Sequence, residues 1–182
     1  EAYEREERFE VNIRIFNIEK DRDLGGPGNR MRIFFQGCLK KCEGCKVEKS
    51  WPLNGGDKMD TSEITKLISA DPELNGITLT GGEPFLQPAQ ALILATFAKG
   101  KGLNVWCYTG YTFEEIREWK DNRKLLLQKI DVLVDGPFEK DKFSLDVPWR
   151  GSWNQRLVDV AKSLEKGEEI EIGRAGQQEC RD

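Results

Sequence analysis

The sequence predicts an α/β fold, in the form of an open partial (β/α) barrel with parallel strands joined by crossover helices. Short β-rich runs alternate with helical segments four or five times along the 182 residues, a pattern typical of parallel sheets. A closed eight-fold barrel typically needs about 250 residues, so this chain is too short for one. We therefore expect one domain over residues 1–182, with residues 1–8 and 174–182 as mobile ends.

The predicted strands are short β-rich runs, and the predicted helices begin at capping signals. Strands are expected at residues 31–36, 76–80, 103–108, 130–134 and 169–172, with an edge strand at 9–18. Asp60 and Thr112 each precede a Glu three residues later, which predicts a capping box at the start of a helix, and Pro88 can begin another. Further helical segments are expected at 125–128 and from 157 to 167, and loops at 24–28 and 50–58.

Three of the five cysteines lie close together in the sequence. Cys38, Cys42 and Cys45 have the spacing C-x3-C-x2-C. A short loop of this kind can direct three thiolates at one point, and thiolates suit iron–sulfur clusters and zinc. Because four cysteines hold an ordinary four-iron cluster, three would leave one iron open to a ligand from outside the protein. The loop follows a predicted strand, and ligand sites of α/β folds gather at carboxyl ends of strands.

Two other interpretations of these cysteines stay open. A structural zinc site needs a fourth ligand, and since the chain has no histidine, this would be Cys107, Cys180 or a carboxylate. Disulfides are less suitable, because an odd number of cysteines cannot all pair and a chain of this size needs no covalent staples. Cys107 is expected to be a buried small residue in a strand, and Cys180 lies in a polar tail.

Composition excludes several classes of partner. The net charge is −4 and both signs are interleaved, whereas a nucleic-acid-binding domain usually shows a basic patch. No apolar run approaches the roughly 20 residues of a bilayer span. Residues 1–7 lack the charged-then-apolar pattern of a secretory signal. We therefore expect a cytoplasmic protein with reduced thiols and no nucleic-acid or membrane partner.

The cysteine spacing resembles the cluster motif of the radical S-adenosylmethionine (SAM) superfamily. The surrounding segments resemble the glycyl-radical activating enzymes, most closely those that activate anaerobic ribonucleoside-triphosphate reductases. The similar segments are 26–30, 33–38, 51, 54–56, 80–84, 109–111, 134–138, 149–152 and 154–156. The cysteine motif followed in order by Gly81-Gly82-Glu83-Pro84 makes the resemblance specific. The resemblance covers most of the chain, and it implies an open partial barrel of the radical SAM type.

The resemblance implies the cofactors and the residues that bind them. A [4Fe-4S] cluster would be held by Cys38, Cys42 and Cys45, with SAM at the open iron. The implied SAM contacts are Thr80, Gly81, Gly82 and Glu83 at its methionine end, and the backbone of Gly44 and Lys46 near its adenine. The cofactors would carry out the difficult chemistry, so the absence of a histidine base is compatible with this enzyme class.

The resemblance also implies the reaction and the partners. Reductive cleavage of SAM would give a 5′-deoxyadenosyl radical, which removes a hydrogen from a glycine of a partner enzyme. That partner would be a glycyl-radical enzyme, namely the large subunit of an anaerobic ribonucleotide reductase. A flavodoxin- or ferredoxin-type protein would donate the electron. Such an activase is a radical SAM oxidoreductase.

Two alternatives differ from this activase in function. Many relatives have Asp where Gly25 stands. Relatives usually also have an aromatic residue just before or after the cysteine that matches Cys45, whereas Gly44 and Lys46 flank it here. These departures leave room for a radical SAM enzyme that acts on a small molecule or a peptide. A non-catalytic metal-binding or electron-carrying module is the second alternative, because the cysteine spacing alone also fits zinc.

Overall fold

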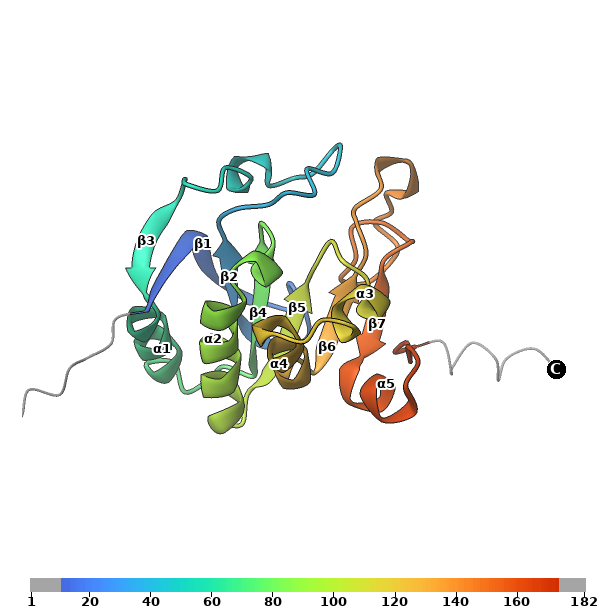
Figure 1. The fold of residues 1–182 in the computed structure, drawn as a ribbon. Coiled ribbons are helices and arrows are strands. Elements are labelled where there is room, and N and C mark those ends of the chain that lie inside the picture. Colours follow the sequence, from blue (N-terminus) through green and yellow to red (C-terminus); the bar gives the residue numbers. More distant parts are fainter. Residues whose placement is uncertain (1–10, 174–182) are drawn as a thin grey trace, which may run out of the picture.

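The computed structural model describes residues 11–173. Expectations for residues 1–8 and 174–182, including Cys180, lie outside this range. The strands are β1 (Asn12–Arg22), β2 (Asn29–Phe35), β3 (Asp57–Asp60), β4 (Gly76–Gly81), β5 (Asn104–Tyr108), β6 (Val132–Asp135) and β7 (Arg156–Asp159). They form a seven-stranded sheet within the described residues, in the order β3-β1-β2-β4-β5-β6-β7 (Figure 1).

The sheet is mixed and open. Its central strands β2, β4, β5 and β6 run parallel, whereas β1, β3 and β7 run antiparallel to their neighbours. Strands β3 and β7 lie at the two edges. The predicted α/β class is therefore confirmed, and closure of the sheet into a barrel is not seen in residues 11–173.

The helices pack a hydrophobic core against one face of the sheet. They are α1 (Thr61–Ser69), α2 (Pro88–Gly100), α3 (Phe113–Arg117), α4 (Asn122–Lys129) and α5 (Val160–Lys166). In β2, Met31, Ile33 and Phe35 are fully buried in the same core as Leu94 of α2 and Leu126 of α4. Side chains on alternate positions of a strand point to opposite faces, so the residues between them point to the other face.

The other face of the sheet is covered by loops. Trp106 of β5 packs there with Val132 and Val134 of β6. The indole rings of Trp149 and Trp106 meet edge to face, with their centres 5.1 Å apart. The glycine-rich segment 23–28 crosses the same face. No helix of the described residues covers this face in Figure 1.

Both predicted capping boxes are confirmed. The Asp60 side chain accepts from the N–H of Ser62 at 2.7 Å, and Glu63 reaches back to the N–H of Asp60 at 2.8 Å. Thr112 and Glu115 form the same arrangement at the start of α3. These reciprocal bonds satisfy N–H groups that the first helical turn leaves unpaired. Helix α3 is short and ends at Arg117.

Three element predictions are wrong in part. The predicted edge strand 9–18 is an inner strand, because β1 pairs with β2 on one side and with β3 on the other. Strand β3 begins within the stretch predicted as a loop, residues 50–58, and extends to Asp60. Leu157 and Val158 belong to β7 rather than to the last helix, which begins at Val160.

The remaining C-terminal prediction is confirmed only as a single contact. Residues 169–172 form no named strand, although Glu171 makes an isolated antiparallel bridge with Val158. None of the helices between residues 11 and 173 has the length and apolar character needed to cross a membrane.

Candidate functional site

The cysteine loop leaves the carboxyl end of β2 and is fixed at its start. The N–H of Gly37 donates to the carbonyl of Ser50 at 2.6 Å, and the N–H of Cys38 donates to that of Trp51 at 3.1 Å. These bonds hold the first ligand candidate against the returning chain. The loop and the segment between β6 and β7 lie beyond the same end of the strands (Figure 1).

The three thiols fit the donor set of an iron–sulfur cluster. Cys38, Cys42 and Cys45 are free and partly exposed. Burial raises the pKa of the Cys38 thiol, while backbone hydrogen bonds from Lys41 and Lys40 oppose the shift. Within residues 11–173, no three Cys, Asp or Glu side chains are gathered in a metal-binding arrangement. The cluster assignment therefore rests on the donor chemistry and the spacing of the three thiols.

The position of Cys107 weakens the zinc alternative. Its side chain is fully buried in the core between the sheet and the helices, as predicted for a small apolar residue. Burial raises the pKa of its thiol well above the ordinary value. Metal binding needs the thiolate, so Cys107 is poorly suited to supply the fourth ligand of a zinc site.

The Gly81-Gly82-Glu83-Pro84 turn contacts the start of the cysteine loop. The N–H of Gly82 donates to the carbonyl of Phe35 at 2.8 Å, and the N–H of Glu83 donates to that of Gly37 at 2.8 Å. A Cβ at Gly82 would lie 2.3 Å from the Gly37 oxygen, and Gly81 has a φ of 91°. Both positions require glycine here, because the two backbones touch.

Glu83 is a buried carboxylate at this junction. Its side chain is 1% exposed and accepts from the hydroxyl of Thr109 at 2.9 Å and from the N–H groups of Gly110 and Phe85 at 2.8 and 3.1 Å. It forms no ion pair with a described lysine or arginine. Burial raises the pKa of Glu83 to about 7, although the hydrogen bonds oppose the shift. The site therefore holds a carboxylate that a cation would stabilise.

Glu83 predicts a pH dependence of stability. Its folded pKa of about 7 lies above the ordinary 4.5, so the folded state binds this proton more tightly than the unfolded state does. The stabilisation is fully present below pH 4.5 and is lost as the pH rises through the folded pKa, by up to about 3 kcal/mol. We expect urea unfolding of cluster-free wild type, relative to Glu83→Gln, to show this loss between pH 4.5 and about 7. A difference that stays constant with pH would contradict the prediction.

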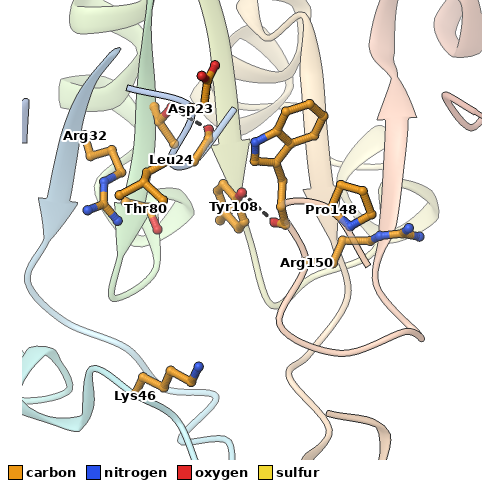
Figure 2. A pocket seen from close by; sticks show the side chains of 11 residues that line it. Asp23, Leu24, Arg32, Lys46, Thr80, Tyr108, Pro148 and Arg150 are labelled. Carbon is orange, nitrogen blue, oxygen red and sulfur yellow. Dashed lines mark hydrogen bonds between the residues drawn. The ribbon is translucent and has the colours of Figure 1, made fainter. Parts of the chain in front are cut away.

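A cavity of about 650 Å³ lies on the loop-covered face of the sheet (Figure 2). Its lining residues are Asp23, Leu24, Gly25, Arg32, Lys46, Thr78, Thr80, Tyr108, Pro148, Trp149 and Arg150. Of the predicted SAM contacts, Thr80 and Lys46 line it. The guanidinium of Arg32 is already paired with Asp21 and Glu19 at 2.7 Å each. The two other cationic side chains that line the cavity, Lys46 and Arg150, have no carboxylate partner among the described residues.

Both predicted SAM contacts on the cysteine loop, Gly44 and Lys46, face the segment after β6. Gly44 has a φ of 79°, and a Cβ there would meet Lys140 and Phe138 at 3.3 and 3.4 Å. The ammonium of Lys46 lies 4.8 Å from the ring centre of Phe143. The structure thus brings the cysteine loop against residues 138–143.

Sequence reasoning missed the wall formed by Tyr108 and Trp149. The hydroxyl of Tyr108 donates to the carbonyl of Trp149 at 2.5 Å. Trp149 has a φ of 58°, an uncommon backbone for a bulky residue. Two signals could have found the wall: Tyr108 falls on the same face of its strand as Trp106, and Trp149 begins one of the family-like segments.

Asp135 and Arg156 lie in two of the family-like segments, and in the structure they form an ion pair. Asp135 is 1% exposed, pairs with the Arg156 guanidinium at 2.6 Å and accepts from the N–H of Phe113 at 2.7 Å. Asp135 raises the pKa of Arg156. The pair therefore links β6, β7 and α3.

Comparison with known proteins identifies the class to which this chain belongs. A family model described as a 4Fe-4S single cluster domain matches residues 24–158. This defines the chain's class and fits the cluster predicted from the three cysteines.

Curated relatives define the family more closely. Anaerobic ribonucleoside-triphosphate reductase-activating proteins match from Pasteurella multocida (37% identity; 72% of this chain and 88% of the relative), phage T4 (35%; 74% and 86%) and Escherichia coli K12 (33%; 72% and 89%). The chain belongs to this family of activating proteins. Among solved structures, QueE from Escherichia coli has a TM-score of 0.46 at 17% identity, covering 56% of this chain and 54% of that one, too weak a likeness to support a conclusion.

Proposed function

We propose that this chain is a radical SAM activase that generates a glycyl radical on an anaerobic ribonucleoside-triphosphate reductase. The observation that carries the proposal is the contact between the cysteine loop and the Gly81-Gly82-Glu83-Pro84 turn, at the Gly37 carbonyl. That contact joins the start of the cysteine loop to a turn suited to a ligand, and the family supports the identity of the partner. When bound, the cluster and SAM supply the one-electron chemistry.

The protein's own residues bind and orient the cofactors. Cys38, Cys42 and Cys45 would hold three irons, leaving one for SAM. Glu83 has no cationic partner in the described region, so a ligand ammonium would meet an unpaired buried carboxylate. The Gly81 and Gly82 backbone allows close approach, since neither carries a Cβ.

The cavity would hold the rest of the ligand. Thr80 lines it near the end of β4, and Lys46 lines it from the cysteine loop (Figure 2). Backbone contacts from Gly44 and Lys46 would face the adenine. Residues 138–143 pack against this loop and would help to exclude water from the reacting atoms.

The proposal also covers the architecture, the partners and the location of the protein. The open sheet works as a partial barrel of the radical SAM type, and residues 1–182 form one domain. The partner is the large subunit of the reductase, and a flavodoxin- or ferredoxin-type protein donates the electron. The protein acts in the cytoplasm, without a nucleic-acid or membrane partner. The interleaved charges support the absence of a nucleic-acid partner, and the free thiols of the described residues support the cytoplasmic location.

Anaerobic reconstitution with iron and sulfide tests the proposal. Electron paramagnetic resonance (EPR) of the reduced protein should show a four-iron signal whose shape changes when SAM is added. Incubation with SAM, a reductant and an anaerobic ribonucleotide reductase should then give a glycyl-radical signal on the reductase. A cluster that responds to SAM without any glycyl radical would favour a small-molecule or peptide substrate. Bound zinc without iron after anaerobic purification would overturn the enzyme assignment.

A further inference from the structure

Arg30 is a fully buried arginine with no carboxylate partner among the described residues. Its side chain is 0% exposed. Nε donates to the Thr78 hydroxyl at 2.8 Å, and Nη2 donates to the Ile77 carbonyl at 2.7 Å. Nη1 donates to Asn104 Oδ1 at 2.6 Å and to the Pro27 carbonyl at 3.1 Å. The guanidinium is therefore paired only with neutral acceptors.

A buried cation of this kind is costly to keep. Transfer of an unpaired charge to the interior carries a penalty of several kcal/mol, and burial lowers the pKa of Arg30 to about 10. An apolar residue of similar volume often serves a core equally well. The use of arginine here is explained by what its fixed set of donors holds in place.

Those donors hold the glycine-rich segment 24–27 flat against the sheet. Arg30 binds the Pro27 carbonyl directly, and the Thr78 hydroxyl, which accepts from Arg30, donates in turn to the Gly25 carbonyl at 2.7 Å. The segment is in close contact with its support. A Cβ at Gly26 would lie 2.9 Å from Arg30 Nε and 2.9 Å from the Trp106 ring.

The same segment forms one wall of the cavity. Leu24 and Gly25 line it together with Thr80 and Tyr108, which project from β4 and β5 (Figure 2). Thr78 itself is a lining residue. The position of this wall therefore depends on two hydrogen-bonded carbonyls, those of Gly25 and Pro27.

We infer that Arg30 is a positioning residue which, with Thr78 as its relay, preforms the SAM cavity by fixing the wall at residues 24–27. The inference rests on the proposed function for the identity of the ligand. Preformed sites bind more tightly because less ordering is needed on binding. Neither residue needs to contact the reacting atoms for this effect.

The test uses Thr78→Val, because an Arg30 variant risks failing to fold. Valine keeps the shape of threonine and removes the relay hydroxyl. In the SAM-free protein, hydrogen exchange of amides in a peptide covering residues 23–28 should speed up roughly tenfold. In the reconstituted protein, the Kd for SAM should rise roughly tenfold, the cost of one buried hydrogen bond. The EPR signal without SAM should not change, and Thr78→Ser should restore both values.

Asn104→Ala is the matched control. It removes another acceptor of Arg30, on a residue that does not line the cavity, and leaves the Gly25 and Pro27 carbonyls bonded. Its thermal stability should fall with little change in loop exchange or SAM affinity. Equal losses of affinity in both variants, or faster exchange in Thr78→Val with unchanged affinity, would overturn the inference. If wild type binds no SAM, the proposed function fails, and the exchange measurement alone still decides whether Thr78 holds the loop.

Discussion

Cys42→Ala protein is expected to lose its cluster signal and its SAM cleavage after anaerobic reconstitution. Cys42 is the central thiol of the loop, and its backbone carbonyl accepts from the N–H of Cys45 at 3.1 Å, a bond the substitution leaves intact. The loss is therefore one of ligand chemistry rather than of loop shape. Changes outside the first ligand shell alone cost about 10- to 100-fold in metal affinity, so we expect cleavage to fall by more than roughly 100-fold. Iron and sulfide content, EPR and 5′-deoxyadenosine formation measure it.

Cys107→Ala is the control for this result. Its thiol is fully buried in the hydrophobic core, so the variant should bind the same iron and cleave SAM at the same rate. Its free energy of unfolding should fall by only about 1 kcal/mol, for a small cavity. Retained cleavage in Cys42→Ala would contradict the assigned ligand set, and loss of iron in Cys107→Ala would revive a four-cysteine site.

Local signals in the sequence were sufficient to predict an element where one local interaction or one apolar run determines it. Asp60 and Thr112 predicted the starts of α1 and α3, because a capping box is formed by residues three apart in the sequence. Strands β2, β4, β5 and β6 were predicted from apolar runs, because they are central strands with one face in the core.

The wrong predictions occur where sequence spacing is ambiguous or where pairing decides. Strand β3 reads Asp57-Lys58-Met59-Asp60, which has no apolar pattern, and it is a strand only because it pairs with β1. Leu157 and Val158 fit a helical spacing with the residues that follow. The boundary is Asp159, whose side chain accepts from the Lys162 N–H at 3.2 Å and caps α5; an Asp before an apolar helical run could have indicated it.

The candidate site shows the same division. The cysteine spacing predicted a cluster site, and the two glycines of the Gly81-Gly82-Glu83-Pro84 turn predicted a ligand contact, because both depend on the type of residue at one position. The sequence could not predict that Glu83 is buried and bonded by Thr109 and Gly110, because those residues come from another strand end. Nor could it show that Arg30, a charged residue in a β-rich run, would be fully buried beneath a loop.

Gly82→Ala is expected to damage both the fold and the site. The added Cβ would lie 2.3 Å from the Gly37 oxygen and 3.0 Å from that of Phe35, and both obstacles are backbone atoms that cannot rotate away. The turn must shift, which weakens the hydrogen bonds from Gly82 to Phe35 and from Glu83 to Gly37. Overpacking together with a weakened buried hydrogen bond should lower the free energy of unfolding by about 2 to 4 kcal/mol, measured by urea denaturation.

Gly100→Ala separates this steric effect from the general cost of replacing glycine. Gly100 is the last residue of α2, and a Cβ there meets nothing within 4 Å. Alanine should leave stability unchanged or raise it by up to about 1 kcal/mol, because it restricts the unfolded chain. Since Gly82 joins the turn to the cysteine loop, its variant should also bind SAM more weakly after reconstitution, whereas Gly100→Ala should not. A Gly82→Ala protein that is as stable as wild type and binds SAM as tightly would show that this junction tolerates a shift, and the contact at Gly37 would lose its role in positioning the site.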